Sequence, residues 1–521
     1  MEEITVHADH GSWLQGAKAI WSIKMGQELK KNGAISVTLF LIIFIISALI
    51  AISWVDISIF PGASSQKALI TSAESPNSTQ KNNGYSLNCS TDQNTTQTCP
   101  KTYPTRHEPD YSSSSSEACP EYFRWIYQDL EPWRKSNGIS KDLVESGKSV
   151  ADIRIVVVNG RVYMEKYRSV FGTRDVFTVW GILQLLRLYP VKLPDLDLMF
   201  GCGDRPVIRK RDYRGVNAGK APPMFHYCGD ESSLDLVFPD WSFWGWPEIN
   251  IKPWESLIEE LEEGNNRTKW VEREPYAYWK GNSRLSKTRR DLMKCNLTDK
   301  QDSNARLYTL AWNQESRKGF KHTNLAGQCV HRYKIYVEGV AWSVSEKYIL
   351  ACDSMTLLVN PRYYDFFTRS LIPTVHYWPI SQNDKCRSVK FAVDWGNSHP
   401  AKAQEIGKEG SKFIQEELQI EHVYDYMFHL LNEYAKLLKY KPTVPPEAVE
   451  ICSDTMACKA KGLDRDFMTQ SMVKNPSNKR ACTMPPPYNV SDLQAFLERK
   501  ANLIEKVKMW EATGNFSGFQ F

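Results

Sequence analysis

The longest apolar stretch of the chain covers residues 34–54, which carry no charged side chain. At a helical rise of about 1.5 Å per residue, a helix of this length crosses a hydrocarbon core of about 30 Å. Four lysines precede it (Lys18, Lys24, Lys30 and Lys31), and only Lys67 follows at a comparable distance. Since cytosolic flanks are enriched in basic residues, we predict a type II anchor with a cytosolic tail over residues 1–33. A cleaved signal peptide is the alternative, although its apolar region is usually shorter.

Residues 55–117 show the opposite pattern, because Ser, Thr, Asn and Gln dominate and large apolar residues are rare. Residues 112–116 are all serine. Such composition predicts a disordered, lumenal stem. Asn-x-Ser/Thr acceptor sites, which are expected on lumenal surfaces, occur at Asn77, Asn88, Asn94, Asn266, Asn296, Asn489 and Asn515.

After Cys119 the pattern becomes that of a globular protein. Apolar residues at 153–158, the pair Asn159-Gly160 and a second run at 161–164 predict a β-hairpin with a type I′ turn. Further strands are expected at 196–200 and 332–337, and their alternation with helical segments favours a parallel α/β organisation. Apolar positions with helical spacing at 406–418 and 423–438 predict core helices. Residues 441–521 are expected to form a C-terminal extension with one helix at 493–510.

Composition narrows the class of protein. A hydrophobic fraction of 42% and 17 Trp indicate large buried cores in a chain long enough for two packed domains. A net charge of +5 is too small to indicate a nucleic-acid partner. All 12 Cys follow the apolar stretch, so in an oxidising lumen most are expected in disulfides, whose pairing stays open.

Four segments resemble the family of Rumi-type protein O-glucosyltransferases and capsule-associated xylosyltransferases, glycosyltransferase family 90. They are residues 194–197 with 203–206, residues 240–247, residues 278–283 with Arg289, and residues 329–347. The resemblance covers residues 118–440 and implies a GT-B fold of two Rossmann-like halves. The acceptor half is then about 118–250, the donor half about 251–410, and closing helices occupy 411–440. It also implies an inverting, metal-independent transfer from a UDP-sugar, with no cofactor.

Asp204 is the expected catalytic base, because an attacking acceptor hydroxyl must lose its proton. It follows the predicted strand 196–200, matches the family's catalytic aspartate, and lies where ligands gather in α/β sheets. A turn-forming Asp is the alternative. Asp195 and Asp197 could form a metal-binding pair, but on a strand both face one side, and we expect that face to be solvated. We therefore predict no metal site.

The leaving UDP needs cations and backbone N–H groups. Residues matching the family's donor-contacting segments are Lys280, Gly281, Asn282, Arg289, Val340, Ser343, Ser345 and Lys347. The alternative for Arg284, Arg289 and Arg290 is an ordinary basic surface helix. Ser345 stands where the glucosyltransferases have an arginine, which leaves the choice between glucose and xylose open.

The aromatic cluster Trp241, Phe243, Trp244 and Trp246 is expected to contribute to acceptor binding, with plain core packing as the alternative. His331 and His376 are expected to be structural. The acceptor is then a protein hydroxyl or a polysaccharide. A non-catalytic, membrane-tethered glycan-binding or scaffold protein is the competing hypothesis. An anchor and stem without a terminal Lys-Asp-Glu-Leu signal favour the Golgi membrane over the endoplasmic reticulum.

Overall fold

The computed structural model describes residues 84–91, 96–101, 117–190 and 192–514, which belong to one compact unit. The predicted anchor at 34–54 and the cytosolic tail lie outside these residues. Within the described part, none of the helices is both long and apolar enough to span a bilayer.

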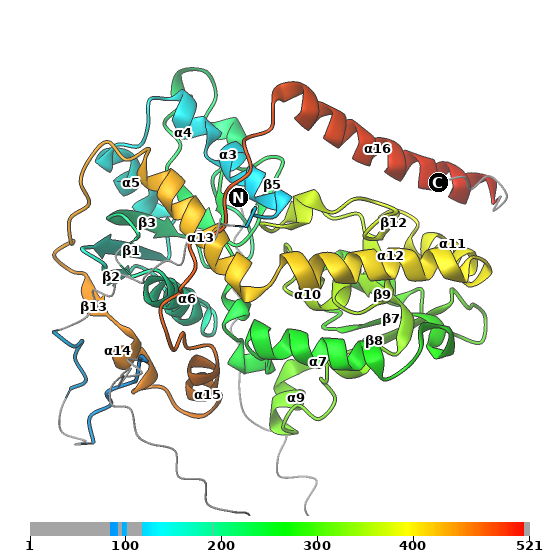
Figure 1. The fold of residues 1–521 in the computed structure, drawn as a ribbon. Coiled ribbons are helices and arrows are strands. Elements are labelled where there is room, and N and C mark those ends of the chain that lie inside the picture. The colour runs from blue at the N-terminus through cyan, green and yellow to red at the C-terminus, as the bar shows by residue number, and fades with distance from the viewer. Residues whose placement is uncertain (1–83, 92–95, 102–116, 191, 515–521) are drawn as a thin grey trace, which may run out of the picture. The chain divides into compact units, whose positions relative to one another are not determined.

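A six-stranded mixed sheet forms the centre of the first half (Figure 1). Its strands in spatial order are β13 (Val449–Ile451), β2 (Arg161–Lys166), β1 (Ile153–Val158), β3 (Leu196–Phe200), β4 (Met224–His226) and β6 (Leu236–Val237). The predicted hairpin is confirmed, since Val158 pairs with Arg161 and the turn residues Asn159 and Gly160 have φ of 51° and 73°. This half differs from the expected parallel pattern, because β1 is antiparallel to both β2 and β3.

A five-stranded sheet forms the centre of the second half, and every pair in it is parallel. Its order is β12 (Trp378–Ile380), β10 (Met355–Val359), β9 (His331–Tyr336), β7 (Glu274–Gly281) and β8 (Ala305–Thr309). The chain runs from β7 outward to β8 and then returns past β7 to β9. The order of strands therefore reverses between β7 and β9, as in doubly wound nucleotide-binding sheets.

Helices cover both sheets. They are α3 (Trp125–Asp129), α4 (Glu131–Lys135), α5 (Lys141–Ser146), α6 (Arg174–Leu188), α7 (Trp254–Asn266), α8 (Lys287–Met293), α9 (Trp312–Arg317), α10 (Ser345–Leu350), α11 (Lys385–Ser398), α12 (Pro400–Lys412), α13 (Ile420–Ala435), α14 (Ser453–Ala457), α15 (Gly462–Gln470) and α16 (Val490–Thr513). A short pair, β5 (Gly229–Asp230) with β11 (Tyr363–Tyr364), joins a segment of the first half to one of the second.

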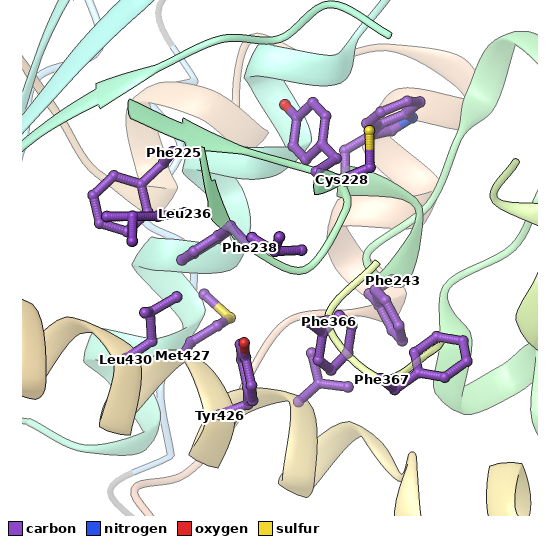
Figure 2. Close-up of a cluster of buried hydrophobic side chains, with 14 of the residues drawn as sticks. Phe225, Cys228, Leu236, Phe238, Phe243, Phe366, Phe367, Tyr426, Met427 and Leu430 are labelled. Carbon is purple, nitrogen blue, oxygen red and sulfur yellow. The ribbon is translucent and has the colours of Figure 1, made fainter. Parts of the chain in front are cut away.

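The first core brings the first sheet together with α13 and with residues from the second half. Figure 2 shows Phe243 with Phe366 and Phe367, and Phe225 and Phe238 near α13 residues Met427 and Leu430. The predicted helix at 423–438 is thus confirmed as a core helix. The segment 406–418 forms α12 and a π-helical turn, Phe413–Glu417.

Asp197 corrects the expectation of a solvated strand face. It is buried in β3, where its two carboxylate oxygens accept hydrogen bonds of 2.7 Å and 2.7 Å from Arg154 on the neighbouring strand. Asp195 Oδ1 accepts a bond from the backbone N–H of Asn159. The Asp197 carboxylate therefore links β3 to β1, since a buried charge requires a paired partner, whereas Asp195 bonds to the hairpin turn.

Disulfides tie distant segments to this framework. The pairs are Cys89–Cys458, Cys99–Cys452, Cys119–Cys482, Cys295–Cys386 and Cys329–Cys352, and Cys202 and Cys228 are free. The expectation that most cysteines form disulfides is confirmed. Cys89 and Cys99 lie in the segment expected to be a disordered stem. Residues 84–91 and 96–101 are instead ordered, because disulfides connect them to Cys458 and Cys452 at the two ends of α14.

The segment after residue 441 is integrated into the fold and is not a separate appendage. Strand β13 extends the first sheet by pairing with β2. Near the C-terminal end of α16, Trp510 packs beside Trp378 of the second half, and Ser388 donates a hydrogen bond to Glu511. Strand β13 has only three residues, which is too short for a strand signal by itself, and its pairing partner β2 lies far away in sequence.

Candidate active site

A cavity of about 1220 Å³ opens where the strand order of the second sheet reverses. Its wall includes the carboxyl end of β7, the loop after β9 and the start of α10, and the loop after β3 provides Gly203 and Asp204. Ligands of open α/β sheets bind at this kind of crevice. Both halves of the described chain therefore contribute to one pocket.

Asp204 lies in this pocket on the loop that follows β3. Its side chain is 41% exposed, and Oδ1 accepts a hydrogen bond of 3.1 Å from Arg174 Nη2. The backbone carbonyl of Asp204 accepts a bond from the buried thiol of Cys228. A carboxylate that is open to the pocket and fixed by one cation has the accessibility that a general base needs.

Arg174, which sequence reasoning missed, holds Asp204 in place. It is the first residue of α6, and its guanidinium lies 4.5 Å from the ring centroid of Trp241. Nη1 donates to the carbonyl oxygen of Cys202, so Arg174 binds the Asp204 loop twice. Nothing in the local sequence distinguishes this arginine, because its partners lie about 30 and 70 positions further along the chain.

Arg289 lines the pocket from the first turn of α8. Its guanidinium donates to the carbonyl oxygens of Glu338, Asn282 and Val337 and to Ser343 Oγ, at 2.9–3.3 Å. Burial lowers its pKa, and it pairs with none of the carboxylates of the described residues. A desolvated cation without a counter-charge creates a positive potential that favours an anionic ligand. The burial of Arg289 therefore differs from the alternative of an ordinary basic surface helix, in which this side chain would be exposed.

Most of the other expected donor-binding residues also line the pocket. They are Lys280, Gly281, Asn282, Val340, Ser343 and Ser345. Ser345 Oγ lies 2.9 Å from Ser343 Oγ, which accepts from Arg289. Ser345, which stands where the family's glucosyltransferases have an arginine, therefore joins the hydrogen-bond network of Arg289.

Lys347 does not fit its expected role in donor binding. Its ammonium group is buried at the contact between the two halves, where it donates to Asp240 Oδ2 at 3.1 Å and to Ser242 Oγ at 2.8 Å. It does not border the pocket. Because α10 turns this side chain away from the cavity, Lys347 instead links α10 to the segment around Trp241.

The aromatic cluster divides into two pairs. Trp241 and Trp246 line the pocket, with ring centroids 4.9 Å apart. Phe243 and Trp244 lie in the core, where Trp244 Nε1 donates to Tyr424 Oη. Their assignment to acceptor binding is corrected, since neither reaches the cavity.

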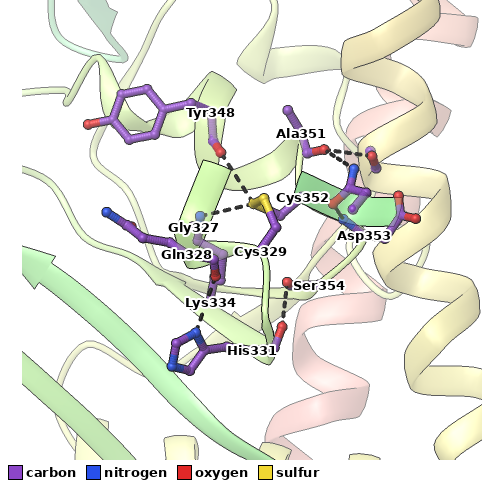
Figure 3. The surroundings of a disulfide bond; sticks show 12 residues. Gly327, Gln328, Cys329, His331, Lys334, Tyr348, Ala351, Cys352, Asp353 and Ser354 are labelled. Carbon is purple, nitrogen blue, oxygen red and sulfur yellow. Dashed lines mark hydrogen bonds between the residues drawn. A yellow bond between two sulfur atoms is a disulfide. The ribbon is translucent and has the colours of Figure 1, made fainter. Parts of the chain in front are cut away.

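A second buried cation was also missed by sequence reasoning. Lys334 on β9 lines the pocket, and its Nζ donates to Cys352 Sγ of the Cys329–Cys352 disulfide at 3.1 Å (Figure 3). Burial, together with repulsion from Arg273, lowers the pKa of Lys334 to about 7. The amine therefore titrates near neutral pH, at the wall of the pocket.

Three histidines have structural surroundings. His331 Nδ1 lies 3.2 Å from the carbonyl oxygen of Gln328, and its ring stacks on Tyr278. His376 Nδ1 accepts from the backbone N–H of Ile372, and burial lowers its pKa to about 4. His226 is fully buried, and its pKa is lowered to about 3 by burial and by repulsion from Arg174. Burial also lowers the pKa of His331, so none of the three has the surroundings of a charged imidazole.

The comparisons with known proteins agree with this geometry. A pocket at a strand-order reversal of an α/β sheet, with buried cations in its wall and a carboxylate at its edge, has the features of a ligand-binding or active site. The model of the family described as glycosyl transferase family 90 matches residues 114–511. This chain belongs to that family, and it is a glycosyltransferase.

Curated relatives are similar to about two thirds of the chain. The chain is 28% identical over 357 residues to O-glucosyltransferase rumi of Drosophila pseudoobscura pseudoobscura, which covers 66% of this chain and 83% of the relative. It is 27% identical over 348 residues to protein O-glucosyltransferase 1 of Homo sapiens, covering 64% and 84% respectively. The competing hypothesis of a non-catalytic scaffold is therefore wrong.

Proposed function

We propose that this glycosyltransferase transfers glucose or xylose from a UDP-sugar to a hydroxyl group of a protein acceptor, with inversion at the anomeric carbon and with Asp204 as the base. The named activity of the relatives, O-glucosyl transfer to protein, supports the acceptor class. As part of the same proposal, we assign the two sheet-centred halves of the chain to a GT-B fold.

In the proposed reaction, Asp204 takes the proton of the acceptor hydroxyl as its oxygen forms a bond to the anomeric carbon. The bond from that carbon to the diphosphate breaks at the same time, and UDP leaves with the electron pair. Arg174 supports this role, because its hydrogen bond of 3.1 Å to Oδ1 holds the Asp204 carboxylate in place at the pocket. The exposed fraction of Asp204 leaves room for an acceptor.

The single observation that carries the proposal is Arg289, a desolvated guanidinium that faces the pocket and has no counter-charge among the described residues. A leaving diphosphate requires such a cation, and the buried charge of Arg289, whose N–H groups are largely bonded to protein oxygens, supplies a fixed positive potential for it. Lys280, whose Nζ donates to the His322 carbonyl oxygen, adds a second positive charge to the wall. In this mechanism protein side chains neutralise the diphosphate, so a metal ion is not required.

We also propose a Golgi membrane location with the catalytic part in the lumen, held by residues 34–54. The five disulfides support an oxidising compartment. The endoplasmic reticulum is the alternative compartment, and imaging of the tagged full-length chain distinguishes the two.

A donor screen tests the proposed reaction. The purified chain is incubated with UDP-glucose or UDP-xylose and a serine-containing acceptor, and free UDP is measured. Asp204→Asn is expected to lower kcat by about 100-fold to 10,000-fold, because amide nitrogen cannot accept the proton. Asp212→Asn, an exposed carboxylate further along the same loop, is the matched control and should retain activity. Full turnover by Asp204→Asn would show that another group is the base.

A further inference from the structure

A second pocket, outside the one described above, has a markedly cationic wall. It is a concavity of about 290 Å³ that we call the basic pocket. Its lining residues are Arg209, Lys210, Arg211, Arg214, Glu231, Ser232 and Arg362. Arg362 precedes β11 in the second half, whereas the other cations follow β3 in the first. Segments from both halves therefore form it.

The carboxylates nearby neutralise only part of this charge. The buried Asp230 lies 3.0 Å from Arg362 and 3.5 Å from Arg209, two of the lining cations. Its oxygens also accept from Ser232, so it has little capacity for further partners. Lys210 and Arg214 have no ion pair with the described carboxylates. The basic pocket therefore retains cations that can bind an anionic ligand.

The basic pocket continues from the loop that carries Asp204. Arg209 follows Asp204 by five positions, so their Cα atoms are at most about 17 Å apart even in an extended chain. Asp235 fixes the segment between them, since its two oxygens accept from the backbone N–H groups of Val207 and Ile208 at 2.9 Å. A polymeric acceptor that reaches Asp204 can therefore extend over the basic pocket.

We propose that the basic pocket binds acidic side chains of the protein acceptor, next to the residue that is modified. The inference rests on the proposed function and defines its acceptor class as an acidic polypeptide segment. Arginine forks pair well with carboxylates. The seven lining residues include no aromatic ring on which a sugar could stack, which favours a peptide over an acidic glycan.

Binding of a defined probe tests this inference on the full-length chain in detergent. The probe is a fluorescein-labelled ten-residue glutamate peptide, followed by anisotropy, with a glutamine peptide and polygalacturonate as comparisons. The double variant Arg211→Glu/Arg214→Glu reverses two exposed charges of the pocket. The matched control Lys408→Glu/Lys412→Glu reverses two exposed charges on α12. Thermal melting checks that all variants remain folded.

We expect the pocket variant to bind the glutamate peptide about tenfold more weakly than the native chain, with the control variant unaffected and the affinity falling as salt rises. Equal affinity of the two variants overturns the inference, as does failure of the native chain to bind the glutamate peptide. Binding of polygalacturonate without the peptide overturns it in favour of an acidic glycan.

The readouts separate this inference from the proposed function. Release of UDP in the donor screen tests the transfer reaction, and it does not require the basic pocket when water is the acceptor. A chain that binds the glutamate peptide but turns over no UDP-sugar contradicts only the proposed function.

Discussion

Buried cations are the most informative single residues of the pocket. Arg289 and Lys334 both line it, and both are almost completely removed from solvent. Neither has a carboxylate partner among the described residues. Such charges reduce the stability of the protein, so an anionic ligand provides the physical reason for retaining them.

Arg289→Lys should raise the donor KM at least about tenfold, because lysine keeps the charge but loses the planar fork that spans three carbonyl oxygens. Steady-state kinetics with varied UDP-sugar measures this. Arg290→Lys, one position later on the same helix and exposed, is the control and should leave KM unchanged. An unaltered KM in Arg289→Lys would remove the argument for diphosphate binding.

Lys334→Met should increase the free energy of unfolding at pH 6, and the increase should shrink towards pH 10. The pKa of Lys334 falls from 10.5 to about 7 on folding. Between these values the unfolded chain binds the extra proton, so the native protein gains stability as pH rises through this window, at about 1.4 kcal/mol per pH unit. Methionine does not titrate, so the variant lacks this contribution to the pH dependence of the free energy of unfolding.

Urea unfolding at pH 6 and at pH 9.5 gives the comparison. The control is Lys300→Met, at an exposed position, which should show no difference between the two pH values. A stability difference that is independent of pH would contradict the lowered pKa of Lys334.

At the scale of secondary-structure elements, the close approach of α6 to the segment Trp241–Phe243 determines where Arg174 and Trp241 meet. Gly181 permits this approach. A Cβ atom at Gly181 would lie 2.5 Å from ring atoms of Trp244, which is fully buried and cannot move away.

Gly181→Ala should therefore destabilise the protein, although alanine is the better helix former by about 1 kcal/mol. Forcing a methyl group into a packed core costs about 1–3 kcal/mol and shifts neighbouring elements. Thermal unfolding measures the loss. Gly327→Ala, whose Cβ would meet its nearest neighbour at 3.5 Å, is the control and should unfold like the native chain. Equal stability of both variants would mean that Trp244 has room to move.

At the scale of the whole described unit, buried polar contacts hold the two sheets together. The ammonium group of Lys347 bonds to Asp240 at 3.1 Å, and both side chains are at most 3% exposed. This ion pair joins α10 of the second half to the segment that carries Trp241 and Trp246. The strand pair β5–β11 and the helix α16 add further links.

Lys347→Met should destabilise the protein by about 3–5 kcal/mol, because it leaves the Asp240 carboxylate buried and unpaired. The double variant Lys347→Met/Asp240→Asn should recover part of the loss, since the amide is neutral and can still accept from Ser242. Denaturant unfolding measures both. The donor KM of the folded variant should be unchanged, and a large rise in KM would return Lys347 to the donor site.

The sequence alone determined the elements whose signals are local. The Asn159-Gly160 turn with its flanking apolar runs predicted β1 and β2, and the run at 196–200 predicted β3, because neighbouring residues decide these conformations. The family motifs likewise identified Asp204, Asn282 and Arg289, which the structure brings to one pocket.

Only the tertiary structure decided what each charged or aromatic side chain contacts. It placed Asp197 in a buried pair with Arg154 and turned Lys347 away from the pocket. It also brought Arg174 to Asp204 and Lys334 to the pocket wall. These contacts join residues from different elements, often far apart in the chain, so no local pattern of hydrophobic and polar positions could encode them. The physical reason is that burial and charge pairing are properties of the packed molecule.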